Sequence, residues 1–121
     1  MDSHQLTALV VGDDRMLRII HGKMLNSVGV KNQVVQNGKE AIHLHLSAQT
    51  FDLILIDMDM PIMNGIQAIK ELRSLGICSI IVGVSARCME SHIQEFMEAR
   101  LDDYFEKPLN IAKLTSFIHK I

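Results

Sequence analysis

The sequence has 121 residues, which suits one compact domain with a substantial hydrophobic core rather than two domains. Apolar residues make up 48% and charged residues 21%, and the formal net charge is −2, so the composition is globular and gives no electrostatic reason to expect nucleic-acid binding. No apolar run approaches the roughly 20 residues that span a bilayer, and the N-terminus lacks the apolar core of a signal peptide. We therefore expect a single domain over residues 1–121, located in the cytoplasm, with the nucleus as an additional open alternative.

Short, continuous apolar runs mark the expected β-strands. In chain order, these runs cover residues 6–11, 34–35, 53–56, 80–84 and 104–105. Because the longer runs are apolar throughout rather than alternating, both faces of each strand should be covered. That pattern is typical of a parallel sheet between two layers of helices.

A helical pattern of apolar residues follows each run, over residues 17–28, 41–46, 66–72, 89–97 and 111–121. Asn64 and Asn110 can cap the helices that follow them, and Gly29 and Gly76 can supply the left-handed residue that ends a helix. The alternation of strand and helix predicts a doubly wound α/β fold, in which ligands bind beyond the carboxyl ends of the strands.

Polar residues stand at those predicted strand ends. They are Asp13 and Asp14 after the first run, Asp57 and Asp59 after the third, Ser85 after the fourth and Lys107 after the fifth. Clustered carboxylates favour a hard cation such as Mg²⁺, and Asp57 directly follows a buried strand, which suits a nucleophile toward phosphorus. Lys107 can neutralise developing phosphoryl charge, and the Ser85 hydroxyl can donate to a phosphoryl oxygen.

Three stretches of the chain carry a resemblance to a known family. They read FDLILIDMDMPIMNG over residues 51–65, VSA over 84–86 and YFEKP over 104–108. The sequence resembles a single-domain response-regulator receiver of two-component phosphorelay signalling, from about residue 9 to 121. The residues at positions 51–65 are most similar to the plant type of this family. The resemblance implies a flavodoxin-like receiver fold, with a five-stranded parallel sheet in the order 2-1-3-4-5 and five helices.

The resemblance also implies a phosphorylation site and a metal site. Asp57 is similar to the family's phosphoacceptor, and Asp13 resembles the acid that directly ligates Mg²⁺. The backbone carbonyl of Asp59 should supply a further ligand, and Asp14 is an additional candidate. The implied partner is a histidine kinase or a His-containing phosphotransfer protein. No nucleic acid, membrane or small-molecule substrate beyond phosphodonors is implied.

A conformational switch is implied as well. Lys107 matches the family's lysine, and the peptide bond that follows it is typically cis in the family. Ser85 and Tyr104 stand where the family has its switch hydroxyl and switch aromatic residue. Phosphorylation would draw Ser85 inward and bias Tyr104 between two rotamers, which would reshape a protein-interaction surface.

Three positions depart from the family pattern, and the mildest is Asn64, which stands where an Asp is often seen and can cap the following helix equally well. The family carries two adjacent acids after the first strand, and Arg18 lies five residues after Asp13, the offset that the family shows from its second acid. On that register Gly12 replaces the first acid, which should weaken Mg²⁺ binding by about 10- to 100-fold. The alternative register pairs Asp13 with Asp14 and breaks this offset, and Asp14 can instead cap the first helix. Arg100 stands where the family usually has Gly, so a positive φ there would cost roughly 1 kcal/mol.

Three functions therefore stay open on the sequence. The first is a phosphoryl-accepting module that is not an enzyme beyond self-catalysed phosphorylation and dephosphorylation. The second is a pseudo-receiver, which binds proteins without phosphorylation because Gly12 removes one acid. The third is an aspartyl-phosphate phosphatase, suggested by Asp57-Met58-Asp59, but that family places the motif on its first strand and here it lies mid-chain.

Overall fold

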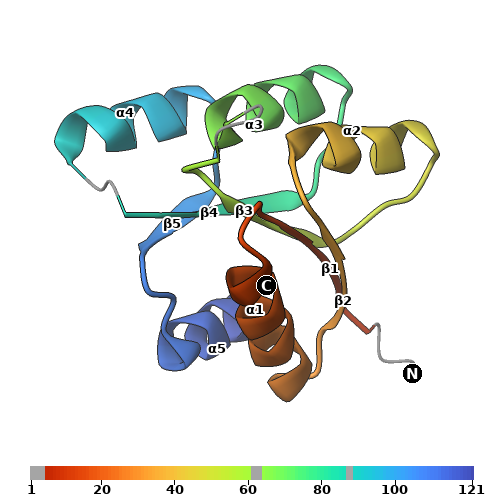
Figure 1. Ribbon diagram of the computed structural model, residues 1–121, viewed down its shortest axis with the longest axis vertical. Coiled ribbons are helices and arrows are strands. Elements are labelled where there is room, and N and C mark those ends of the chain that lie inside the picture. The colour runs from red at the N-terminus through yellow and green to blue at the C-terminus, as the bar shows by residue number, and fades with distance from the viewer. Residues whose placement is uncertain (1–4, 61–63, 87–88) are drawn as a thin grey trace.

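Within residues 5–60, 64–86 and 89–121, which the computed structural model describes, five β-strands and five α-helices alternate along the chain (Figure 1). The elements are β1 (Thr7–Val11), α1 (Arg15–Ser27), β2 (Lys31–Val35), α2 (Gly38–Leu46), β3 (Leu53–Asp57), α3 (Gly65–Ser74), β4 (Ile80–Ser85), α4 (Glu90–Glu98), β5 (Asp103–Glu106) and α5 (Ile111–Lys120). Each predicted strand and helix is present. In the described residues, no helix is long and apolar enough to cross a bilayer.

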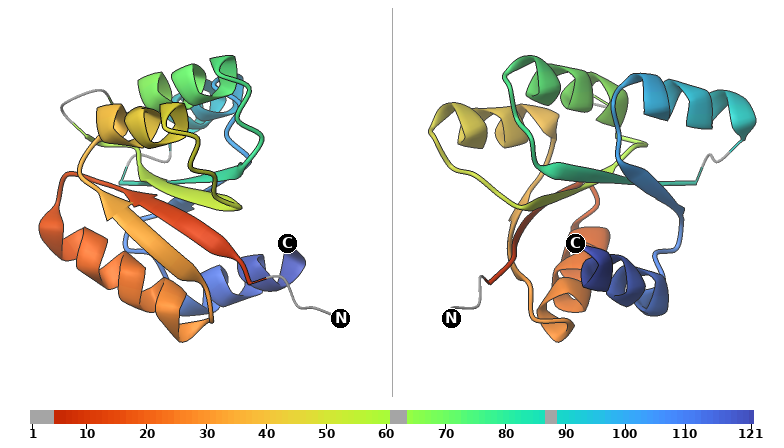
Figure 2. Two further views of the ribbon diagram at one scale, coloured as in Figure 1. Left: turned by 90° about the vertical axis from the view of Figure 1, so that its right-hand side faces the viewer. Right: turned by 180° about the vertical axis from the view of Figure 1, so that it is seen from behind.

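The five strands form one parallel sheet in the order β2-β1-β3-β4-β5, which confirms the predicted order. Helices α1 and α5 cover one face of this sheet, and α2, α3 and α4 cover the other (Figures 1 and 2). All strands run in the same direction, so their carboxyl ends lie along one edge, which we call the carboxyl edge.

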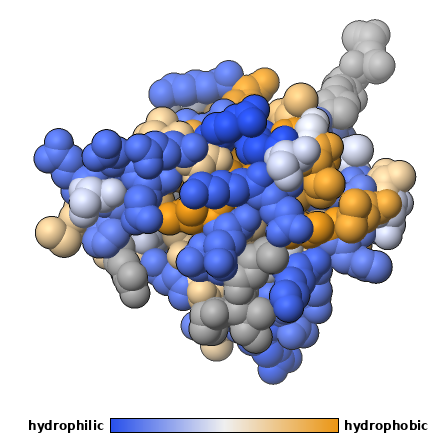
Figure 3. Space-filling model, turned by 90° about the horizontal axis from the view of Figure 1, so that it is seen from above, coloured by the Kyte–Doolittle hydropathy of each residue, from blue (hydrophilic) through white to orange (hydrophobic). Residues whose placement is uncertain are grey.

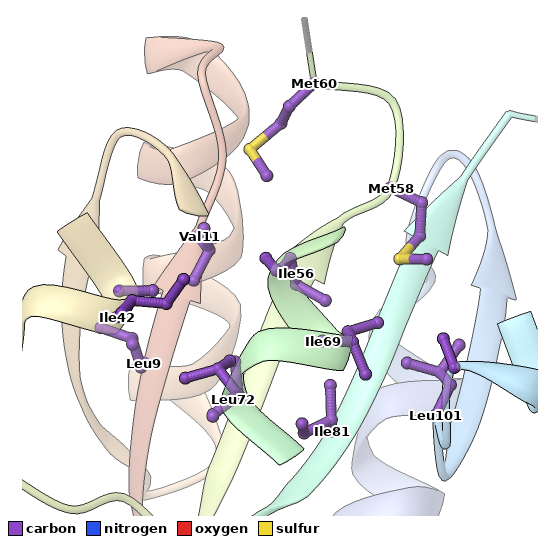
Figure 4. Close-up of a cluster of buried hydrophobic side chains, with 14 of the residues drawn as sticks. Leu9, Val11, Ile42, Ile56, Met58, Met60, Ile69, Leu72, Ile81 and Leu101 are labelled. Atoms are coloured by element: carbon purple, nitrogen blue, oxygen red, sulfur yellow. The ribbon is translucent and has the colours of Figure 1, made fainter. Parts of the chain in front are cut away.

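The continuous apolar runs are explained by two hydrophobic cores, one on each face of the sheet. Leu9, Val11 and Ile56 point into the core under α2, α3 and α4 (Figure 4), whereas Ala8 and Val10 point into the core under α1 and α5. Neighbouring strand residues thus enter opposite cores, because side chains alternate between the two faces of a strand. The outer surface of the helical layer α2–α4 is mostly hydrophilic, with hydrophobic residues visible between the hydrophilic ones (Figure 3).

Local signals in the sequence set most helix boundaries. The Asn64 side chain accepts from Gln67 N in a reciprocal capping box, and the Asn110 side chain caps α5. Gly29 and Gly76 have φ values of 81° and 85°, as expected for left-handed helix ends. The prediction for β2 was too short, because this edge strand begins with exposed polar residues from Lys31 onward that carry no apolar pattern.

The side chain of Arg73, which is 8% exposed, links the segments that precede β4 and β5 at the edge of the sheet opposite the carboxyl edge. Arg73 donates to the carbonyl oxygens of Ile77 (2.9 Å), Ser79 (2.8 Å) and Arg100 (3.1 Å) and to Asp102 Oδ2 (2.8 Å). Arg100 has a φ of 73°, so this non-glycine residue does adopt the left-handed conformation whose cost was considered from the sequence. The hydrogen bond from Arg73 to the Arg100 carbonyl helps to hold a backbone conformation that is unfavourable for a non-glycine residue.

Candidate functional site

Strand register brings the predicted site residues to adjacent positions on the carboxyl edge. Asp57, the last residue of β3, pairs with Val84 of β4, and Ser85 pairs with Glu106 of β5. Lys107 follows β5 directly, and its backbone N–H donates to the Ser85 carbonyl at 2.9 Å. Residues that are 28 and 50 positions apart along the chain, counted from Asp57 to Ser85 and to Lys107, therefore meet in one place.

The two hydrogen bonds to the Asp57 carboxylate both reach the same oxygen atom, Oδ1. Its side chain is 7% exposed, and Oδ1 accepts from Asp59 N (2.8 Å) and from Lys107 Nζ (3.0 Å). Among the described residues, Oδ2 has no hydrogen-bond partner. A carboxylate fixed through one oxygen on a rigid strand end presents the other oxygen as a positioned nucleophile or ligand.

Lys107 bridges two carboxylates. Its Nζ lies 3.0 Å from Asp57 Oδ1 and 3.3 Å from Asp59 Oδ2. Burial acts to lower the pKa of Lys107, but hydrogen bonds and charge interactions with Asp57 and Asp59 outweigh it, so this pKa lies above its ordinary value. The ammonium is therefore charged at neutral pH and balances part of the negative charge of the pocket.

The Asp59 side chain collects hydrogen bonds that the sequence did not predict. Ser85 Oγ donates to Oδ1 at 3.1 Å, and Ala86 N donates to Oδ2 at 2.9 Å. Burial acts to raise the pKa of Asp59, but these two donors and Lys107 outweigh it and lower the pKa below its ordinary value. Sequence reasoning assigned Asp59 a role through its carbonyl only, because no sequence signal pairs it with a hydroxyl 26 positions away.

Gly12 lies directly against Asp57. A Cβ atom placed on Gly12 would lie 3.5 Å from Asp57 Cβ and 3.9 Å from Asp57 Oδ2, at ordinary contact distances. The Gly12 carbonyl accepts from Arg18 Nη1 at 2.7 Å. A side chain at position 12 would thus face the Asp57 oxygen that has no hydrogen-bond partner among the described residues.

Asp13 and Asp14, which follow Gly12 after β1, have different environments. Asp13 is exposed, and no hydrogen bond or ion pair joins its carboxylate to another described residue. Asp14 Oδ1 accepts from Met16 N (2.8 Å) and Leu17 N (3.2 Å), so this side chain caps α1. Hydrogen bonds and ion pairs join Asp57, Asp59, Ser85 and Lys107, and among the described residues none joins Asp13 or Asp14 to this group.

The oxygen donors at the carboxyl edge suit a hard divalent cation. Asp57 Oδ2 is unpaired among the described residues and Asp13 is exposed to solvent one residue beyond Gly12. In the described residues, no group of three acidic, His or Cys side chains is close enough to hold a metal ion by itself. A site of few protein ligands completed by waters fits Mg²⁺, which keeps several waters and uses one or two carboxylates.

Tyr104 and the histidines complete the surroundings. Tyr104 is half-buried on β5, and its ring centroid lies 6.2 Å from that of Phe96 in α4. His21 of α1 is 6% exposed, and burial lowers its pKa, while the charge of Asp57 raises it and that of Lys107 lowers it. His45 of α2 is also buried.

The fold and the pocket together define a doubly wound α/β domain with an aspartate, a lysine and a hydroxyl at the carboxyl edge of the sheet. The family model of the response regulator receiver domain matches residues 8–119. The chain belongs to this family, whose members are the receiver domains of response regulators in two-component phosphorelay signalling.

Individual relatives agree with this assignment. The chain is 57% identical over 117 residues to "Two-component response regulator 24" of Arabidopsis thaliana, covering 97% of this chain and 84% of that protein. A Francisella response regulator 1452 receiver domain is 28% identical, with a TM-score of 0.87 and coverage of 96% of this chain and 95% of that one. The receiver domain of the sensor histidine kinase PA1611 of Pseudomonas aeruginosa, 24% identical with a TM-score of 0.83 and 97% coverage of both chains, shares the fold, and its structure has a magnesium ion in the active site cleft.

Proposed function

We propose that this chain is the phosphoryl-accepting receiver of a His-to-Asp phosphorelay, with Asp57 as the phosphoacceptor. The observation that carries the proposal is the asymmetric environment of Asp57. Lys107 and the Asp59 backbone hold Oδ1, whereas Oδ2 faces the space beside Gly12. The donor would be a phosphohistidine on a histidine kinase or on a phosphotransfer protein.

In the transfer, Asp57 Oδ2 attacks the phosphorus atom of the phosphohistidine. The oxygen–phosphorus bond forms as the phosphorus–nitrogen bond breaks, and the imidazole leaves with the bonding electron pair and takes a proton. Lys107 is 3.0 Å from the other Asp57 oxygen and can follow the negative charge onto the phosphoryl group. The chain thus acts as a signalling phosphoacceptor rather than as an enzyme with turnover.

Mg²⁺ would neutralise phosphoryl charge when it is bound. The residues that would hold it are Asp57, Asp13 and the backbone carbonyl of Asp59. Asp14 is left out of this set, because its side chain caps α1. The missing acid at Gly12 would make the affinity for Mg²⁺ lower than that of a site with two adjacent acids.

The phosphorylated state would be read through Ser85 and Tyr104. The Ser85 hydroxyl is fully buried and donates to Asp59 in the unphosphorylated structure, so it must change partner to donate to a phosphoryl oxygen. Tyr104 packs against Phe96, which links the strand beside Ser85 to α4. A change at the pocket can reach the α4 surface by this route.

Intact-protein mass spectrometry after incubation with Mg²⁺ and acetyl phosphate tests the proposal. Wild type should gain the mass of one phosphoryl group, and Asp57→Asn should gain none. Asp14→Asn is the matched control and should still be phosphorylated, because asparagine caps a helix as well as aspartate does. If neither acetyl phosphate nor a phosphohistidine donor adds a phosphoryl group to the protein, the proposal is refuted.

The position of Gly12 favours a second candidate function. A pseudo-receiver would use the same fold to bind a partner without phosphorylation, since position 12 contributes no acid beside Asp57. Titration with Mg²⁺ and beryllofluoride, followed by amide NMR, separates the two candidates. Specific shifts at Asp57 and Ser85 would exclude the pseudo-receiver. Their absence in wild type and their appearance in Gly12→Asp would support it.

A further inference from the structure

A cavity of about 510 Å³ extends from the phosphoacceptor pocket to α4. Asp59 and Ser85 line it at the carboxyl edge, and His92 and Phe96 line it from α4. The cavity therefore joins the two residues whose hydrogen bond must break on phosphorylation to the helix that carries the expected response.

His92, which lines this cavity, has an unsatisfied ring nitrogen. Its Nδ1 atom is buried and has no hydrogen-bond partner among the described residues. A buried polar atom without a partner is unfavourable, so a partner that becomes available nearby should attract it. Helix α4 can respond, because Phe96 is its only described residue that is fully buried and its N-cap Met89 makes no side-chain capping bond.

Phosphorylation would create such a partner. Ser85 has one hydroxyl hydrogen, so it cannot donate to Asp59 Oδ1 and to a phosphoryl oxygen at once. When the hydroxyl turns to the phosphoryl group, Asp59 Oδ1 loses a donor. Lys107 and Ala86 are placed on the other oxygen, Oδ2.

We infer that His92 is a positioning residue of the switch: its Nδ1–H donates to Asp59 Oδ1 after the Ser85 hydroxyl has moved to the phosphoryl group. The inference rests on the proposed function and names how that site would regulate α4. The exchange draws α4 toward the pocket and keeps the Asp59 carboxylate satisfied in the phosphorylated state. Two other polar side chains line the cavity but fit the role less well. Glu95 has no hydrogen to donate when ionised, and Asn64 is exposed and caps α3.

Nitrogen-15 NMR of the His92 ring tests the exchange, with Mg²⁺ and beryllofluoride as the probe. In wild type, the Nδ1 resonance should shift to the value of a hydrogen-bonded N–H on beryllofluoride binding. In Ser85→Ala without beryllofluoride, Asp59 Oδ1 also lacks the hydroxyl donor, so the same shift should appear there. The ring of His43, exposed on α2, serves as the internal reference and should not respond in either experiment.

Substitutions add a functional measurement. His92→Leu removes the donor and should weaken beryllofluoride binding by about two- to tenfold, the range of one hydrogen bond. His92→Gln keeps an N–H donor and should retain most of the affinity, and His43→Leu should match wild type. A merely structural role of His92 would not give the spectroscopic shift or the rescue by glutamine.

The outcomes separate this inference from the proposed function. Amide shifts at Asp57 with no response of the His92 ring, or equal affinities of His92→Leu and wild type, would overturn the inference and leave the proposed function intact. No beryllofluoride binding in wild type or in any variant would overturn both.

Discussion

Replacement of Gly12 by aspartate is the perturbation that most directly examines the unusual feature of this pocket. The backbone at Gly12 is not in the left-handed region, and a Cβ there would make contacts of 3.5 and 3.9 Å with Asp57. The side chain of Gly12→Asp should therefore fit without strain. Its carboxylate would lie roughly 5 Å from the Asp57 carboxylate, close enough for strong interaction.

The expected effects of Gly12→Asp on stability and on Mg²⁺ affinity follow from the added negative charge. Without metal, two carboxylates at about 5 Å and an effective dielectric constant near 20 repel by up to about 3 kcal/mol, less where solvent screens them. With metal, the added acid should restore the outer contacts whose loss typically costs about 10- to 100-fold in affinity. Gly12→Asp should thus unfold at a lower temperature than wild type without Mg²⁺, and the difference should shrink or reverse at saturating Mg²⁺.

Calorimetric titration with Mg²⁺, paired with thermal unfolding at several Mg²⁺ concentrations, measures both effects. Gly12→Asn is the matched control, because it has nearly the same shape without the charge. If Gly12→Asp and wild type bind Mg²⁺ equally, or if Gly12→Asn tightens binding as much as Gly12→Asp, then position 12 does not complete the metal site and the reasoning from its contact with Asp57 fails.

Three further predictions concern stability. Burial acts to raise the pKa of folded Asp59, but hydrogen bonds outweigh it and lower this pKa below the value in the unfolded chain. The free energy of unfolding should therefore fall as the pH drops below about 4 and through the folded pKa. Asp59→Asn should flatten this decline when the free energy of unfolding is measured by urea titration at several pH values. Arg73→Met removes the arginine donor from three carbonyl oxygens and one of the two donors to Asp102 Oδ2, which still accepts from Ile81 N. It should lower the free energy of unfolding by about 2–4 kcal/mol, whereas Arg15→Met on the exposed start of α1 should change it by less than about 0.5 kcal/mol. Arg100→Gly removes the penalty of a φ of 73° and should raise the free energy of unfolding in urea titrations by about 1 kcal/mol, and no gain would contradict backbone strain at this position.

The sequence determines the fold of this chain more clearly than it determines the contacts of the site. The strands over residues 53–56 and 80–84 were predictable because central parallel strands are buried on both faces and are therefore continuous apolar runs. The polar part of β2 was not predictable in this way, because an edge strand has exposed positions without a periodic apolar signal. Strand topology alone places Asp57 and Lys107 together.

Side-chain contacts between distant segments were harder to foresee. The bond from Ser85 to Asp59 depends on the path of the chain after β3, for which the sequence carries no signal. The buried Nδ1 of His92 depends on how α4 packs over the sheet, and the spacing of residues within α4 does not specify that packing. The place of Gly12, in contrast to these side-chain contacts, could be predicted from the sequence. The offset of Arg18 from Asp13 predicted its place in the pattern, and the structure places it beside Asp57.

The central claim is that the Asp57 carboxylate becomes an acyl phosphate. Borohydride reduction of the phosphorylated protein, followed by peptide mass spectrometry, locates such a group, because reduction converts only a phosphorylated aspartate to homoserine. Homoserine at position 57, dependent on Mg²⁺ and absent from unphosphorylated samples, is the predicted result. Homoserine at another aspartate, or at none after treatment with a phosphohistidine donor, would contradict the assignment.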